Sequence, residues 1–164
     1  MAKARAPAVT TFVLGVVAGA FIALGGVLST IIGTGSELGF GPTRFLSGIG
    51  FSLGLILVIA AGAELFTGNN LIAMSWVSGH IPIGRLLQNW AIVYVGNLIG
   101  ALSVVAMVYL GKWWAQADDA VGATALTIAV TKAAPLRSGP DARHPGQRPR
   151  LPRGLAGIGR SKLD

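Results

Sequence analysis

Long stretches without a charged residue are the main feature of the chain up to about residue 130. Three of them, at residues 11–36, 45–63 and 86–111, consist mostly of Val, Leu, Ile, Ala and Gly. A bilayer core about 30 Å thick is crossed by roughly 20 apolar helical residues, so each stretch predicts a transmembrane helix. A fourth apolar run, at residues 120–130, is too short to span alone and predicts the start of a fourth helix. The pattern therefore predicts an all-α membrane protein.

Two basic residues, Lys3 and Arg5, precede the first stretch. A signal peptide also has a basic start, but its apolar region spans only about 7–15 residues. The stretch at 11–36 is longer, and further apolar segments follow it, so we expect a retained helix. Because Lys and Arg favour the cytoplasmic side of a membrane, residues 1–10 are expected to form a cytoplasmic N-terminus.

Glycines recur four residues apart within each of the three predicted helices. The pairs are Gly15 and Gly19, Gly50 and Gly54, and Gly96 and Gly100. In lipid, small residues at this spacing allow helix backbones to approach closely. We expect these glycines to pack helices together, within one bundle or between subunits.

The composition also indicates a membrane protein. Hydrophobic residues make up 52% of the chain and charged residues 12%, whereas soluble domains contain about 25% charged residues. The chain has no cysteine, and the sequence contains no paired carboxylates, metal-binding cluster or nucleophile with a matching base. We therefore expect no enzyme activity, no catalytic residue, no metal site and no cofactor.

A polar segment at residues 64–70 follows the second apolar stretch directly. Glu64, Gly68, Asn69 and Asn70 stand there between apolar residues. Irregular backbone at membrane depth is tolerated only where protein buries it or where it lines a water-filled path. A broken helix with polar residues is a recurring form of transport site. We therefore predict a helix break, shaped by these four residues, beside a permeation path. The alternative for Glu64 is that it caps a half-helix at residues 71–77.

Two motifs resemble signatures of the formate/nitrite transporter family. They are IAAGAELFTG at residues 59–68 and NWAIVYVGNLIGA at residues 89–101. The resemblance covers about residues 10–134, with both motifs in order. It implies an aquaporin-like protomer of six helices in two inverted halves, with a broken second helix. It further implies a homopentamer with one pore in each protomer, in a multi-pass arrangement in a bacterial-type inner membrane. This chain would hold the first half of the bundle.

The resemblance also implies which residues narrow the pore. By position they are Phe51, Leu55, Leu65, Phe66 and Thr67. For the first two, four apart on one helical face, ordinary helix packing is the alternative. The implied function is the passage of a small monovalent anion, formate or nitrite. This passage is either passive or linked to a proton, which would lower the cost of a bare charge in an apolar constriction. Membrane lipid is the expected surrounding partner. Neither His80 nor His144 matches the histidine that family members carry in their fifth helix.

Residues 135–164 do not resemble the family. They hold five of the eight prolines, and seven of the 13 Lys and Arg residues lie after residue 132. Such a basic, Pro-rich and Gly-rich composition is typical of a disordered segment. A nucleic-acid-binding segment would interleave aromatic residues for base stacking, and this one has none. We therefore expect no nucleic-acid partner.

A shifted reading frame is another explanation for this tail. With GC-rich codons for residues 144–156, a one-base shift can yield GILGNALVCLAVWL, which resembles the family's second signature at the start of helix five. The chain would then consist of the N-terminus at 1–10, a transmembrane region at 11–134 and a frameshifted tail at 135–164. On this interpretation the alternative function is that of a truncated, non-conducting membrane fragment.

Overall fold

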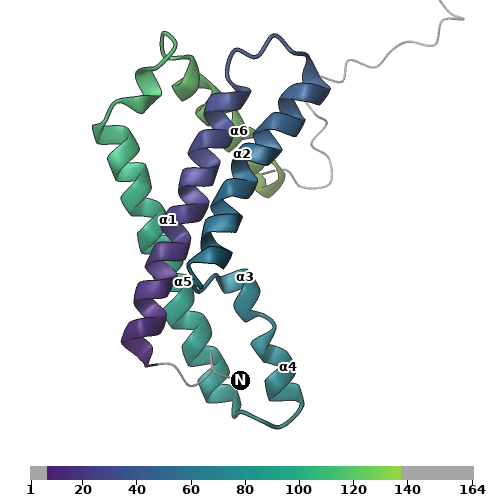
Figure 1. The fold of residues 1–164 in the computed structure, drawn as a ribbon, viewed down its shortest axis with the longest axis vertical. Coiled ribbons are helices and arrows are strands. Elements are labelled where there is room, and N and C mark those ends of the chain that lie inside the picture. Colours follow the sequence, from purple (N-terminus) through teal and green to yellow (C-terminus); the bar gives the residue numbers. More distant parts are fainter. Residues whose placement is uncertain (1–6, 138–164) are drawn as a thin grey trace, which may run out of the picture. The chain divides into compact units, whose positions relative to one another are not determined.

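The structure, a computed structural model, describes residues 7–137. Over this range all regular secondary structure is helical (Figure 1). The elements are α1 (Ala8–Gly33), α2 (Phe40–Ala60), α3 (Phe66–Asn69), α4 (Ile72–Val77), α5 (Ile83–Leu110), the 3-10 helix η2 (Trp113–Ala115) and α6 (Ala120–Arg137). Of these, α1, α2 and α5 are long and apolar enough to cross a membrane. The all-α class and the three membrane-capable helices are therefore confirmed.

The three long helices begin several residues before the uncharged stretches that predict them. Pro7 and Pro82 stand immediately before α1 and α5, with extended backbone at ψ 142° and 151°. Because proline lacks an N–H, it fits a position where a helix would leave that group unbonded. Arg44 lies near the start of α2 and Arg85 in the first turn of α5. The absence of charge thus marks the apolar middle of each helix, and the helix itself starts earlier.

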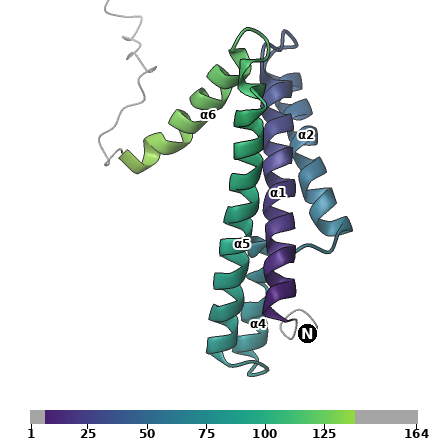
Figure 2. The same ribbon diagram turned by 90° about the vertical axis from the view of Figure 1, so that its left-hand side faces the viewer.

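Helix α1 packs along both α2 and α5 (Figures 1 and 2). Glycines occupy these contacts. A Cβ atom added to Gly96 of α5 would lie 3.2 Å from the Cα of Gly15 on α1. One added to Gly54 of α2 would lie 2.6 Å from the carbonyl oxygen of Phe21 on α1. The helices therefore meet backbone to backbone, the close approach that small residues permit in lipid.

The buried apolar core of the described chain is small. Ala18, Val58 and Ala63 form a buried cluster, with Phe21 and Leu65 among the partly buried residues around it. Many large apolar side chains of the long helices point outward instead, as in the exposed stretches of α2 and α5. Lipid tails and neighbouring helices are as apolar as these side chains, so this distribution fits a membrane protein.

The last described helix, α6, runs through Pro135 to Arg137. Its apolar part, Ala120–Ala133, is shorter than a membrane span. The helix therefore continues past residue 134, where the sequence analysis ends the transmembrane region. Residues 138–164 lie outside the described range, so the interpretations of the tail as disordered or frameshifted remain predictions.

Candidate functional site

The second membrane helix is broken after Ala60. Gly62 has a left-handed backbone (φ 62°). Its N–H donates to the carbonyl of Ile59, and the N–H of Ala63 donates to the carbonyl of Val58. This pair of bonds around a left-handed glycine is the Schellman motif, a common way to end a helix. The break is therefore encoded by Gly62, two residues before the polar segment that predicts it.

The irregular part of the break spans residues 61–65. The chain then forms the short helix α3, Phe66–Asn69, and after Asn70 and Leu71 the half-helix α4. The break thus starts earlier than the predicted 64–70, and most of that segment is helical. The N-cap residues of α3 and α4 are Leu65 and Leu71, whose side chains make no capping hydrogen bond. The alternative role of Glu64 as a cap of the half-helix at 71–77 stays a prediction.

Glu64 lies inside the break with 5% of its surface exposed. Its backbone N–H donates to the carbonyl of Leu14 on α1 (3.2 Å). Its backbone carbonyl accepts a hydrogen bond from Nδ2 of Asn97 on α5 (2.9 Å). Both backbone groups of Glu64 are therefore satisfied by neighbouring helices, as irregular backbone at membrane depth requires.

Asn97 is the residue that joins the break to the two neighbouring helices. Its Nδ2 donates to the carbonyls of Gly15 (2.8 Å) and Glu64 (2.9 Å), and its Oδ1 accepts from the N–H of Phe66 (2.9 Å). Asn97 stands within the second motif, NWAIVYVGNLIGA, but its role was not predicted from the sequence. An amide in the middle of an apolar helix was the available signal, because a buried polar group needs partners.

A second set of contacts fastens α3 to α5. Trp90 donates its indole N–H to the carbonyl of Asn69 (3.1 Å), and the Asn69 amide donates to Oδ1 of Asn89 (3.1 Å). The ring of Phe66 meets those of Trp90 and Tyr94 edge to face, with centroids 5.9 and 5.7 Å apart. Phe66 therefore packs against α5, and Asn69, with 1% of its surface exposed, is a structural link.

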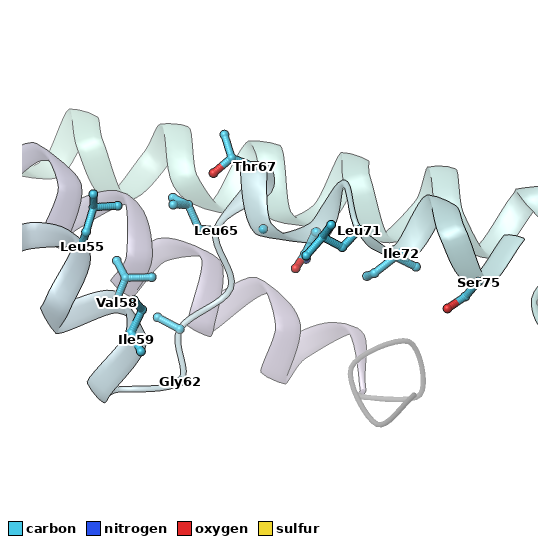
Figure 3. A pocket seen from close by; sticks show the side chains of 12 residues that line it. Leu55, Val58, Ile59, Gly62, Leu65, Thr67, Leu71, Ile72 and Ser75 are labelled. Atoms are coloured by element: carbon cyan, nitrogen blue, oxygen red, sulfur yellow. The ribbon is translucent and has the colours of Figure 1, made fainter. Parts of the chain in front are cut away.

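A pocket of about 710 Å³ lies beside the break (Figure 3). Three of the five predicted constriction residues line it: Leu55 from α2, Leu65 from the break and Thr67 from α3. Phe51 and Phe66 are not among its lining residues. The rest of the wall comes from the end of α2, the break, α3 and α4. The wall is mostly aliphatic, with polar groups from Thr67, Asn69 and Ser75.

The predicted loop-shaping residues have different environments. Gly68 and Asn69 line the pocket, Glu64 is buried, and Asn70 is exposed and does not line the pocket. Within residues 7–137 no three His, Asp or Glu side chains gather as metal ligands would. The pocket wall therefore offers apolar contact and a few uncharged hydrogen-bonding groups.

Comparison with known proteins assigns the family. The model of the formate/nitrite transporter family matches residues 1–139. The chain belongs to this family. It is 40% identical over 129 residues to the formate channel FocA of Escherichia coli (strain K12), a match covering 77% of this chain and 45% of FocA. It is 37% identical over 135 residues to a probable formate transporter of Methanothermobacter thermautotrophicus, covering 80% and 49%.

A solved member of the family has the same fold. The structure described as a pentameric formate channel with formate bound superposes with a TM-score of 0.68 at 34% identity, covering 76% of this chain and 49% of that chain. This chain thus spans about half the length of the relatives it matches. The resemblance carried by the two motifs is confirmed, and this family member is a membrane protein with a broken second transmembrane helix.

Proposed function

We propose that this protein takes part in carrying a small monovalent anion, formate or nitrite, across a membrane. Membership of the formate/nitrite transporter family supports the proposal, and so do relatives named as formate channels and transporters. The observation that carries it is the wall beside the helix break, where Leu55, Leu65 and Thr67 lie together. These side chains would narrow the path of the anion.

The chemistry of this wall suits a weak acid better than a permanent ion. Moving a bare charge into an apolar constriction is expensive. Formate and nitrite can each take up a proton, and the neutral acid crosses leucine side chains at much lower cost. The Thr67 hydroxyl can donate a hydrogen bond to an anion oxygen at the edge of the wall. Passage with a proton is therefore part of the proposal.

The proposed assembly is a homopentamer in a bacterial-type inner membrane, crossed several times by each protomer. The relative described as a pentameric formate channel supports the stoichiometry. The outward-facing apolar side chains of α2 and α5 would contact membrane lipid or the next protomer. Phe51, with 39% of its surface exposed, stays a proposed pore residue. It would line a part of the pore that lies beyond the described wall.

Uptake of formate and of nitrite tests the proposal. The gene is expressed in bacteria that lack their own transporters of this family, and each anion is measured separately. We expect saturable uptake that Leu55→Ala alters, because Leu55 lines the pocket. Leu57→Ala, the matched control on α2, should leave uptake unchanged, because Leu57 is not a lining residue.

The same assay addresses the alternative of a non-conducting membrane protein. Uptake no higher than in cells with an empty vector, with the protein present in the membrane fraction, would favour that alternative and contradict the proposal. Equal effects of Leu55→Ala and Leu57→Ala would remove the wall beside the break as its basis.

A further inference from the structure

We propose that Asn97 is a positioning residue for the wall beside the break: its carboxamide holds the backbone on both sides of Leu65 and so sets the anion selectivity of the protein. The claim about backbone position stands on the contacts alone. The claim about selectivity rests on the proposed function.

Two of the three hydrogen bonds of Asn97 lie on either side of one residue of the wall, Leu65. The carbonyl of Glu64 precedes Leu65 and the N–H of Phe66 follows it, and Asn97 bonds both at 2.9 Å. The two peptide groups that flank Leu65 are therefore tied to one side chain. The backbone of Leu65 is extended (φ −95°, ψ 133°), and its carbonyl accepts a hydrogen bond from the N–H of Asn69 at the start of α3 (3.0 Å). Its side chain lines the pocket.

The third bond makes α1 part of the same device. Asn97 also donates to the carbonyl of Gly15 on α1 (2.8 Å), while the N–H of Glu64 bonds to Leu14, the preceding residue of α1. Both Nδ2 hydrogens and the Oδ1 oxygen are thus in use, which engages the donor and acceptor ends of the carboxamide. The break is thus held to α1 and α5 by this side chain together with the backbone bond from Glu64 to Leu14.

Only an asparagine meets this set of partners. An aspartate would turn a carboxylate oxygen toward two carbonyl oxygens, and a leucine of similar size would leave all three backbone groups without their partner. A glutamine keeps the carboxamide but adds a methylene. Asn97 reaches the carbonyl of Gly15 because α1 is close: a Cβ on Gly15 would lie 3.6 Å from Nδ2 of Asn97.

Loss of this carboxamide should loosen the break without releasing the whole segment. The bonds from Trp90 to Asn69 and from Asn69 to Asn89 hold α3 independently of Asn97, and the Schellman motif ends α2 on its own. The expected consequence of Asn97→Ala is therefore a local opening around Leu65.

The absence of cysteine in this chain allows a direct measurement. Leu65→Cys introduces a reporter at the partly buried residue of the break where the opening is expected, and the rate of its reaction with a small membrane-impermeant thiol reagent is measured in membrane vesicles. In the Asn97→Ala background we expect the rate to rise about tenfold, which corresponds to about 1.4 kcal/mol. Ser103→Ala is the matched control, because the Ser103 hydroxyl on α5 bonds only its own helix at Ile99.

The outcomes separate this inference from the proposed function. A reporter rate in Asn97→Ala within about twofold of wild type would overturn the claim about position. If this variant does not accumulate in the membrane, Asn97→Ser replaces it, because one hydroxyl cannot bond all three backbone groups, and a wild-type rate there would overturn the claim equally. The thiol reagent could react faster with Asn97→Ala although the wild-type protein takes up neither formate nor nitrite. That result would support the claim about position and contradict the proposed function.

Selectivity is read from the ratio of formate to lactate uptake. A loss of folded protein lowers both fluxes by the same factor, whereas a displaced wall changes their ratio. We expect Asn97→Ala to lower the ratio, because a looser wall admits the larger anion more readily. A wild-type ratio together with an opened break would refute the claim about selectivity.

Discussion

Replacing Gly19 by alanine tests the close contact between α1 and α5. The added methyl group would overlap the carbonyl oxygen of Asn97, the nearest atom, and would lie 2.7 Å from both the Cα and the carbonyl carbon of that residue. Carbon atoms in favourable contact are about 3.5–4.0 Å apart, so the two helices must separate locally by roughly 1 Å. The obstacle is backbone, which cannot rotate out of the way as a side chain can.

The expected loss of stability has two parts. Inserting a methyl group into a tightly packed contact costs about 1–3 kcal/mol. The separation would also stretch the bond from Asn97 to Gly15, now 2.8 Å long, and a lost hydrogen bond of this kind costs about 0.5–1.5 kcal/mol. Together the two terms predict that Gly19→Ala lowers the free energy of unfolding by about 1.5–4.5 kcal/mol.

Gly26→Ala is the matched control on the same helix. A Cβ at Gly26 meets nothing within 4 Å, so we expect a change of no more than about 0.5 kcal/mol. Both variants are purified in bicelles and unfolded with increasing SDS, with helix content followed by circular dichroism. Equal stability of Gly19→Ala and Gly26→Ala would show that α1 and α5 are not in backbone contact, and the close approach that lets Asn97 bond to Gly15 would be refuted with it.

Three further substitutions test other parts of the chain. Phe66→Ala removes both edge-to-face contacts with Trp90 and Tyr94 and should cost about 2–4 kcal/mol of unfolding free energy. The variant should also lower the formate-to-lactate uptake ratio. A wild-type stability and a wild-type ratio would contradict this prediction. Trp90→Phe keeps an aromatic ring at this position but removes the indole N–H that bonds to the carbonyl of Asn69. The unfolding midpoint should therefore drop by an amount equivalent to about 1 kcal/mol. Ala117 has a left-handed backbone (φ 54°), which costs about 1–2 kcal/mol for a residue with a Cβ; Ala117→Gly should therefore raise the unfolding midpoint, and a fall would refute the strain.

The membrane helices could be predicted from the sequence because their signal is local. A span needs a run of apolar residues, and residues 11–36, 45–63 and 86–111 provide it whatever surrounds them. The same reasoning predicted the interruption near Glu64, because irregular backbone within the membrane must be buried in protein or line a water-filled path. The helix ends were less accurate, because they depend on Pro7, Gly62 and Pro82, which act through backbone geometry and carry no hydropathy signal.

The roles of individual residues at the break were decided by tertiary structure. Leu55, Leu65 and Thr67 come from three segments and line one pocket, while Phe66, next to two of them in sequence, packs against Trp90 and Tyr94. Adjacent residues of a short helix point in different directions, so position in a motif does not say which side chain faces the pocket.

Asn97 shows the same division most clearly. The sequence alone determines that an amide stands in the middle of an apolar helix and requires partners there. Its partners are Gly15, Glu64 and Phe66, on two other segments of the chain. Hydrogen bonds are short and directional, and whether three groups so far apart in sequence meet one carboxamide depends on how closely α1 and α5 pack. That distance is a property of the folded chain.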